Sequence, residues 1–392
     1  MTFPKNKISW IIIIFFIALL LSPLIMHLFW VLKPEKSIDI IIVDKTVVNN
    51  QKNEHASLNW LLNNLKINRN SDKTLYSNDD YYGFFPLENE KFYISDFEKM
   101  DSAELKNVLN KNQMIYITDT YGVYSNEWYK HALTAERSQL IYGGLSKKEI
   151  EILKFFKDQK KLIIAEFNCI GSPTEKSVRN NFEELFHIRW TGWMGRYFSD
   201  LSETNPDIPH WLVNNFKKQH QNKWSFSKSG IAFVNENDKI EILEAGRDLT
   251  ASTPIIYTNK VNSAKYNLPK EIPYPYWFDI LQMEDINIPI SLYHINTTGS
   301  GDSIMSRNGI LKTFPAVISH NAGDYEFFYF AGDFADNNIS RNFSHFSGIP
   351  FIKSVESSFH EDDRENFYWN YYYPLMSKIL EKYYDSLRVK GL

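Results

Sequence analysis

The chain has 392 residues but only one cysteine, Cys169. A single cysteine excludes an intrachain disulfide and any zinc or iron–sulfur site built from several cysteines. No long basic block is present and the formal net charge is -4, which argues against nucleic acid as a partner. The histidines form no His-x-His pair, and neither HExxH nor GxSxG occurs. These absences argue against zinc-hydrolase and ordinary serine-hydrolase sites.

Aromatic residues, in contrast, are abundant. They make up 16% of the chain, with 23 Tyr, 28 Phe and 10 Trp, and hydrophobic residues as a whole make up 43%. The hydrophobic share predicts a well-packed globular body. The aromatics have two interpretations: they fill the core, or some form a surface that stacks on sugar rings or other flat ligands.

One apolar run, residues 8–32, is long enough to span a hydrocarbon core of about 30 Å. It follows a short tail, 1–7, that carries Lys5 and Lys7, and it precedes a stalk, 33–37. The rival interpretation is a cleaved signal peptide, which would normally have a shorter apolar region and end in small residues. We therefore expect a single-pass anchor in the lipid bilayer, with the N-terminus cytoplasmic and the body extracytoplasmic.

After the anchor, strand and helix patterns alternate up to about residue 200. Buried-strand runs such as "SIDIIIVDKTVV" are followed by segments with apolar residues at helical spacing. This alternation predicts an α/β fold with a doubly wound, mostly parallel sheet. The α/β domain would span 38–200. Residues 201–305 read as a β-rich insertion or a second subdomain, and 306–392 as late strands and a C-terminal helix that complete the α/β domain.

Capping patterns in the sequence predict the N-termini of two helices. Ser146 and Glu149 have capping-box spacing before a strong helical pattern. Ser172 and Glu175 have the same spacing, with Pro173 at the first helical position.

Several predicted strands end in a carboxylate. The residues are Asp44, Asp96, Asp119, Glu166 and Asp333. In parallel sheets, ligands bind outside the carboxyl ends of the strands, so these acids are expected along one edge. Glu166 and Asp119 are the candidate catalytic pair, and Asp44, Asn168 and Asp333 are candidate substrate-binding residues. Acids also occur at strand ends simply because the strand meets solvent there.

Carboxylates at such an edge have three possible uses. A pair can serve as acid and base in glycoside hydrolysis. Several can bind a hard divalent cation through oxygen. They can also hydrogen-bond sugar hydroxyls without catalysis. No metal or cofactor is predicted from the residues themselves.

The stretch "HIRWTGWMGRYFSDL" combines tryptophans, arginines and glycines. Trp193 and Tyr197 are candidates for a stacking platform, and Arg196 for a donor to anions or hydroxyls. The alternative is a tight turn whose aromatics fill the core.

The order of strand, helix and strand around "YGGLSKKEIEILKFF" and "KKLIIAEFN" resembles the class I glutamine amidotransferase-like fold, over residues 38–200 with 310–335 as later strands. The resemblance implies a nucleophilic cysteine in a small-residue turn, followed by a His–Glu pair. In the turn around Cys169 only Gly171 suits a crowded elbow, and "FHED" at 359–362 lies in a polar loop. The catalytic triad is therefore expected to be absent, and Cys169 to be a small residue in a strand-to-helix turn.

These observations lead to three hypotheses about function. The first is a membrane-anchored protein that binds or processes cell-envelope carbohydrate at the carboxyl edge of its sheet. The second is a catalytically inert scaffold that recruits membrane protein partners. The third is a metal-dependent hydrolase that uses the same acids.

Overall fold

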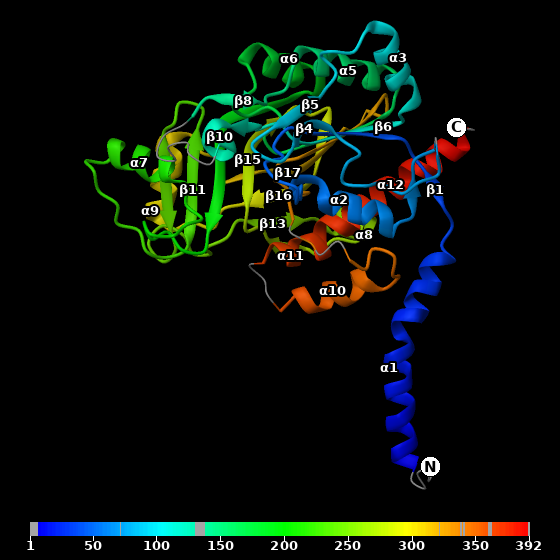
Figure 1. Ribbon diagram of the computed structural model, residues 1–392. Helices are drawn as coiled ribbons and strands as arrows, with labels where there is room; N and C mark the ends of the chain where they lie inside the picture. The colour runs from blue at the N-terminus through cyan, green and yellow to red at the C-terminus, as the bar shows by residue number, and fades with distance from the viewer. Residues whose placement is uncertain are drawn as a thin grey trace.

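The computed structural model describes all residues except 1–6, 71, 130–137, 321, 338, 340–341, 360–362 and 391–392. Most of the expected N-terminal tail, and three residues of "FHED", lie outside the described residues. The architecture is an α/β body with two sheets and one long apolar helix that projects away from it (Figure 1).

The main sheet has ten strands in the order β14-β13-β16-β17-β18-β9-β6-β2-β4-β5. Its parallel part comprises β4 (Tyr82–Pro86), β2 (Ile40–Asp44), β6 (Met114–Asp119), β9 (Leu162–Glu166) and β18 (Glu326–Phe330). The antiparallel strands are β5 (Phe92–Ser95) at one end and β17 (Thr313–His320), β16 (Asn287–His294), β13 (Ile255–Thr258) and β14 (Glu271–Pro273) at the other.

The sheet is therefore mixed, whereas the sequence predicted a mostly parallel one. Among the late strands, β13 is joined to β14 through α8 (Lys260–Tyr266) and β16 to β17 through α9 (Gly299–Asn308), and both pairs are antiparallel. A helix between two strands therefore did not mean a parallel crossover here. Among the parallel strands the spatial order is 2-1-3-4-5 in chain order, as in doubly wound folds of the flavodoxin type.

A second, antiparallel sheet has the order β12-β11-β10-β15. Its strands are β12 (Ile240–Glu244), β11 (Gly230–Asn235), β10 (Ile188–Phe198) and β15 (Trp277–Met283). Of the segment 201–305, only β11, β12 and β15 belong to this sheet, because β13, β14 and β16 extend the main sheet. Two short pairs complete the strands: β1 (Lys36–Ser37) with β3 (Ile67–Asn68), and β7 (Val123–Tyr124) with β8 (Leu140–Tyr142).

Helices cover both faces of the main sheet (Figure 1). One face carries α3 (Ser102–Lys111), α5 (Lys147–Asp158) and α6 (Lys176–Phe186), and the other carries α2 (Asn53–Asn64) and α12 (Tyr373–Val389). The remaining helices are α4 (Ser125–Trp128), α7 (His210–Gln219), α8 (Lys260–Tyr266), α9 (Gly299–Asn308), α10 (Ile349–Ser357) and α11 (Arg364–Phe367), with a π-helical turn at Tyr368–Tyr372.

The two predicted helix starts have different outcomes. At α5 the Ser146 hydroxyl accepts from the Glu149 N–H, and the Glu149 carboxylate accepts from the Ser146 N–H, so the capping box is present. Helix α6 begins only at Lys176, with Glu175 as the residue before it. The Thr174 hydroxyl donates to the Cys169 carbonyl and accepts from the Leu145 N–H, which holds this segment in a turn.

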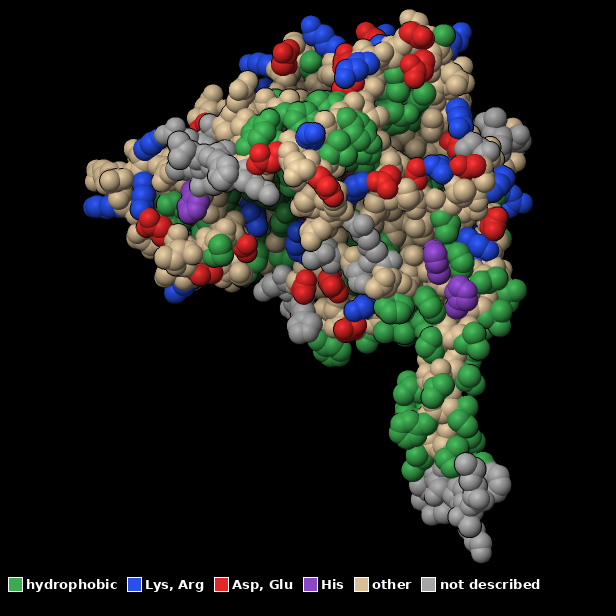
Figure 2. All heavy atoms as spheres, viewed as in Figure 1, with side chains coloured by type: hydrophobic (Ala, Val, Ile, Leu, Met, Phe, Trp, Pro, Cys, Tyr) green, Lys and Arg blue, Asp and Glu red, His purple; other side chains and the backbone are tan. Residues whose placement is uncertain are grey.

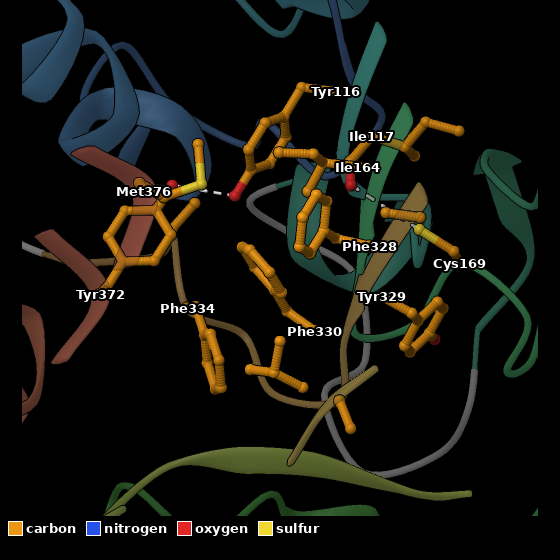
Figure 3. Packing of buried hydrophobic residues seen from close by; sticks show 14 of the residues in the cluster. Tyr116, Ile117, Ile164, Cys169, Phe328, Tyr329, Phe330, Phe334, Tyr372 and Met376 are labelled. Atoms are coloured by element: carbon orange, nitrogen blue, oxygen red, sulfur yellow. Dashed lines mark hydrogen bonds between the residues drawn. The ribbon is translucent and has the colours of Figure 1, made fainter. Parts of the chain in front are cut away.

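The core lies between the main sheet and its covering helices, and Figure 3 shows its centre. There the hydroxyls of Tyr116 and Tyr372 are 2.9 Å apart, which joins β6 to the π-helical turn. Cys169 is fully buried, and its thiol donates to the Ile117 carbonyl at 3.8 Å. Burial raises the pKa of the Cys169 thiol well above its usual range. The thiol therefore acts as a packing group, because burial disfavours the thiolate that a nucleophile requires.

Helix α1 (Lys7–Val31) is the predicted apolar segment. Its stretch from Trp10 to Val31 is long and apolar enough to cross a membrane, and it lies outside the body of the molecule (Figure 1). An exposed N-terminal apolar helix fits a signal anchor or a signal peptide. Helix α1 is attached to the body near its C-terminal end, where the Trp30 indole N–H donates to the Asn63 carbonyl at 3.1 Å.

Candidate functional site

Two of the predicted acids meet where the strand order reverses. Asp44 at the end of β2 and Asp119 at the end of β6 are register partners in the parallel pair. The chain continues from β2 to β4 on one side and reaches β6 on the other. This switch point is where open α/β sheets bind ligands. Both carboxylates are buried.

The Asp44 carboxylate is already occupied by a histidine that the sequence did not single out. The His55 Nδ1 lies 2.5 Å from Asp44 Oδ2, and the His55 Nε2 lies 3.0 Å from the Asn78 carbonyl oxygen. Asp44 Oδ1 also accepts from the Thr46 N–H at 3.0 Å. Because a carbonyl can only accept, the His55 Nε2 carries a proton in this arrangement. Asp44 is thus bound to the protein at both oxygens.

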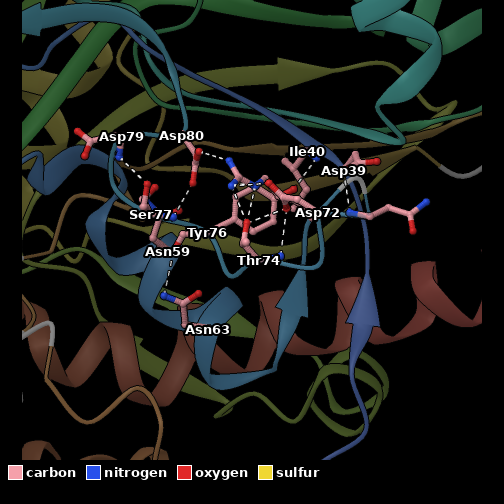
Figure 4. A network of polar contacts seen from close by, with 12 residues as sticks. Asp39, Ile40, Asn59, Asn63, Asp72, Thr74, Tyr76, Ser77, Asp79 and Asp80 are labelled. Carbon is pink, nitrogen blue, oxygen red and sulfur yellow. Dashed lines mark hydrogen bonds and ion pairs between the residues drawn. The ribbon is translucent and has the colours of Figure 1, made fainter.

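The loop that supplies the Asn78 carbonyl is held by the polar network in Figure 4. Arg69 forms an ion pair with Asp72 at 2.9 Å and another with Asp80. The Tyr76 hydroxyl accepts from the Ile40 N–H at 2.8 Å and donates to the Ile38 carbonyl at 2.7 Å. This network fixes the loop against the start of β2, and so it fixes the partner of His55.

Glu166 is enclosed on all sides at the end of β9. Its Oε2 accepts from the backbone N–H groups of Phe334 and Ala335 at 3.0 and 2.9 Å, and its Oε1 accepts from the Tyr116 hydroxyl. Burial raises the pKa of Glu166 to about 8, even though these hydrogen bonds oppose the rise. With no exposed atom, Glu166 acts on the segment after β18 and has no free face for a ligand.

That segment carries two further acids, one at each end. Asp333 follows β18, and its backbone N–H donates to the Trp277 carbonyl at 3.2 Å. Asp336, three residues later, accepts from the Tyr276 hydroxyl at 3.0 Å and lies 3.3 Å from Arg364 Nη2. Burial, and then the charge of Asp336, raise the pKa of Asp333 well above its usual range.

Glu54, in the first turn of α2, joins the same group of acids. Burial, and then the nearby charges of Asp44 and Asp336, raise the pKa of Glu54 well above its usual range. Burial also raises the pKa of Asp119, and the charges of Asp44 and Asp336 add to the rise. We call the four carboxyls Glu54, Asp119, Asp333 and Asp336 the acidic edge. Buried acids with raised pKa values, as Glu54, Asp119 and Asp333 are, are typical of functional sites.

Two arginines and an aromatic group border the acidic edge. Arg364 stacks on the Tyr276 ring, 3.4 Å from its centroid, and Arg196 lies 4.5 to 5.5 Å from the ring centroids of Phe198, Tyr276 and Trp277. Burial lowers the pKa of Arg196. Arg364 Nη2 is held by its ion pair with Asp336. Arg196 Nε is buried and has no hydrogen-bond acceptor in the described part of the chain, so it is a donor available to a ligand.

The other predicted binding residues lie elsewhere. Trp193 and Tyr197 are buried, and so their rings offer no stacking face. Asn168 is buried at a left-handed position (φ 65°), and its N–H donates to Asp279 Oδ2 at 3.2 Å. Burial raises the pKa of Asp279 to about 7. Asp96 is half-buried after the antiparallel strand β5, with β4 between that strand and β2.

The residues that complete the site were missed at the sequence level. Glu54, His55, Asp336 and Arg364 come from helices and a loop, whereas the pattern used to find acids was the end of a strand. Asp336 is the last residue of "AGDFAD", three residues after Asp333, so the repeated acid was a usable signal.

Two other features bear on the site. Among the described residues, no three His, Cys, Asp or Glu side chains are grouped so as to hold a metal ion. A cavity of about 520 Å³ lies between α6, β10 and β15, lined by Asn180, Glu183, Glu184, His187, Ile188, Arg189, Gln282, Met283 and Glu284. None of the predicted site residues lines it.

No protein-family model matches this sequence, and no curated protein matches it. Solved structures that are similar to it include the carbohydrate deacetylase Agd3 (9% identity, 76% of this chain and 30% of that chain, TM-score 0.32). A β-galactosidase from Bacillus circulans sp. alkalophilus is also similar (10% identity, 78% of this chain and 30% of that chain, TM-score 0.32). A ThuA-like protein from Parabacteroides merdae is similar as well (10% identity, 76% of this chain and 79% of that chain, TM-score 0.33).

This chain spans less than a third of the deacetylase and galactosidase chains. The chain is thus structurally similar to ThuA-like proteins and β-galactosidases at low identity, and its resemblance to the class I glutamine amidotransferase-like fold stays a prediction. At these TM-scores the similarities carry no argument about activity.

Proposed function

We propose that this chain is a membrane-anchored protein that binds carbohydrate at the acidic edge of its main sheet. The observation that carries the proposal is the convergence of four carboxyls, the ion-paired Arg364, the Arg196 Nε donor without an acceptor, and half-buried aromatic rings at one switch point. Carboxyls accept and, when protonated, donate hydrogen bonds, as sugar hydroxyls require. Tyr276 and Trp277 are half-buried beside these groups, and one face of the Tyr276 ring already carries Arg364.

The balance of charge indicates which carbohydrate fits. The acidic edge has four carboxyls against the guanidinium groups of Arg196 and Arg364. A polyanionic glycan would add like charge to this site, which is unfavourable in a partly buried place. The proposal is therefore for a neutral or amino-bearing glycan.

Processing of the glycan would use the same carboxyls. Burial raises the pKa values of Asp119 and Asp333, and a raised pKa is the property that a carboxyl needs to act as a general acid. Glu166, which we expected to be catalytic, has the position of a residue that holds the 333–336 segment in place. We assign it that positioning role in the proposal.

The anchor part of the proposal is that α1 spans the bilayer, with the N-terminus in the cytoplasm and the body outside. Lys5 and Lys7 precede the span, and lysines on the cytoplasmic side favour this orientation. Protease added to intact cells should then degrade the body. Protection of the body in intact cells, with degradation after lysis, would reverse the orientation.

A second candidate, a catalytically inert scaffold, is favoured by one observation. The inner part of the edge is filled, because Asp44 is occupied by His55 and Glu166 by Tyr116 and two backbone N–H groups. Acids that are already hydrogen-bonded within the protein are not available to a small ligand, which agrees with a protein that recruits partners instead. The binding experiment decides between the two candidates.

The experiment is calorimetric titration of the full chain in detergent with chitotetraose, cellotetraose and tetragalacturonate. We expect a neutral oligosaccharide to bind and the polyanionic one not to bind. Arg364→Gln should weaken binding by about tenfold, since it removes a charged hydrogen-bond donor. The matched control is Arg388→Gln, at an exposed position of α12, which should bind as the unsubstituted chain does. Equal affinity in both variants would refute the site, and no binding to any probe would favour the scaffold.

A further inference from the structure

Helix α10 carries an apolar face that no other described part of the chain covers. Its large apolar side chains are 48 to 79% exposed: Phe351 74%, Ile352 49%, Val355 48%, and Phe359 79% just after the helix. The positions 351, 352, 355 and 359 follow the spacing of a single helical face. Phe343, before the helix, is 57% exposed. Five large apolar residues gathered on one exposed segment indicate a binding surface.

The position of α10 relative to α1 identifies what this face meets. The Ser347 N–H, just before α10, donates to the Met26 carbonyl of α1 at 3.0 Å. The His27 Nδ1 lies 2.9 Å from the His345 carbonyl oxygen, and the rings of Trp30 and His345 are 4.5 Å apart. The start of α10 is therefore fixed to the last turns of the apolar helix.

That attachment sets the depth of α10. Met26 lies five residues before Val31, where the apolar span ends. At 1.5 Å per residue, this is about 7 Å below the end of the span. Helices that lie in the plane of a membrane bury their apolar face about 5–10 Å into the boundary between headgroups and acyl chains. Figure 1 shows α10 at the margin of the body beside α1, running across the direction of α1.

The space-filling view agrees with this placement. Figure 2 shows hydrophobic side chains along α1 and again at the margin of the body beside it. On α10 itself, Lys353 and Glu356 form an ion pair at 3.0 Å, so the segment adds little net charge. The apolar surfaces of α1 and α10 thus face one common region.

We infer that α10, with Phe343 and Phe359, is a second contact with the lipid bilayer, lying in the plane of its outer interface. This inference rests on the anchor part of the proposed function. Two contacts, one spanning and one in the plane, hold the body in one orientation on the membrane. Asp336 and Arg364 flank the α10 segment in the chain, so this contact also holds the acidic edge beside the lipid surface. The glycan bound there would be one attached to, or lying at, the membrane.

The test uses the full chain in nanodiscs of phosphatidylcholine and phosphatidylglycerol, with a nitroxide spin label on one introduced cysteine. The variants are Phe351→Cys and Val355→Cys on α10, Leu20→Cys on α1, and Lys218→Cys on α7 as the aqueous control. The only native thiol, Cys169, is fully buried, so the unsubstituted chain serves as the unlabelled reference. Collisions with oxygen, which enters lipid, and with a nickel chelate, which stays in water, are measured for each label.

We expect the nickel chelate to collide with the labels at 351 and 355 about tenfold less often than with the label at 218, while oxygen reaches them freely, because both sites face acyl chains. Nickel collisions at 351 equal to those at 218, with the label at Leu20 in lipid, would overturn the inference and leave the anchor intact. Labels at 351 and 355 shielded from both reagents would show a protein contact instead and would also overturn it. A water-exposed label at Leu20 would overturn the anchor, and the inference with it.

Discussion

Glu166 Oε2 accepts a hydrogen bond of 2.9 Å from the backbone N–H of Ala335. This contact joins the end of β9 to a segment that carries Asp333 on one side and Asp336 on the other. A buried acid that looked catalytic in the sequence therefore acts on the acidic edge through the backbone that it holds.

Substitution of Glu166 is expected to show whether it holds the backbone of the 333–336 segment or acts as a catalytic acid. Glu166→Ala leaves two buried N–H groups without an acceptor, and each such loss costs roughly 1–3 kcal/mol in the free energy of unfolding. Glu166→Gln keeps an amide oxygen for the two N–H groups and should cost less. Urea unfolding measures both variants. If Glu166→Ala were as stable as the unsubstituted chain, the positioning role would be wrong.

The pH dependence of stability should carry the signature of buried protonated acids. Burial raises the pKa of Glu166 to about 8 from a usual value of 4.5, and that of Asp279 to about 7 from 3.8. The native state then binds more protons than the unfolded state between these values. The free energy of unfolding should therefore fall as pH rises from about 5 to 7, by about 1.4 kcal/mol per pH unit for each group.

Glu166→Gln should remove its share of that slope, and urea unfolding at several pH values measures it. Glu151→Gln, at an exposed position on α5, is the matched control and should leave the slope unchanged. A slope for Glu166→Gln as steep as that of the control would contradict the prediction.

The pair of His55 and Asp44 should be strongly coupled. His55→Ala leaves the buried Asp44 carboxyl without its ring partner, and leaving a buried polar group without its hydrogen bond costs roughly 1–3 kcal/mol in the free energy of unfolding. The double variant His55→Ala with Asp44→Asn should lose less than the sum of the two single losses, because it removes the unpaired charge. A double-mutant cycle in urea measures the coupling, and strictly additive losses would be the contrary result.

Cys169 should be chemically silent in the native chain. Its side chain is fully buried and its thiol pKa is raised by burial, so neither access nor ionisation favours reaction. Labelling by a maleimide or by Ellman's reagent should be complete in urea and slower by orders of magnitude in buffer. Lys218→Cys provides an exposed thiol in the same chain as the control. Rapid labelling of native Cys169 would restore the hypothesis of a nucleophile.

The features predicted correctly from the sequence are those decided by local patterns. The apolar run became α1, the alternation of strand and helix became the parallel part of the sheet, and Ser146 and Glu149 form the predicted capping box. Asp44, Asp119 and Glu166 are the last residues of β2, β6 and β9, whereas Asp96 and Asp333 lie after β5 and β18. What local pattern did not reveal was pairing, because the antiparallel strands β13 to β17 owe their direction to partners far along the chain.

By itself, then, the sequence determined which segments are apolar, which are periodic and where carboxylates follow strands, since these depend on near neighbours in the chain. Only the tertiary structure decided which of those carboxylates are occupied. His55 reaches Asp44 from α2, the amides at 334 and 335 reach Glu166 from beyond β18, and Arg364 reaches Asp336 from α11. The reason is physical: a buried carboxyl needs a hydrogen-bond or ion-pair partner, and that partner is whichever group packs against it in the fold. The partners of Asp44 and Glu166 lie 11 to 169 residues away in the chain.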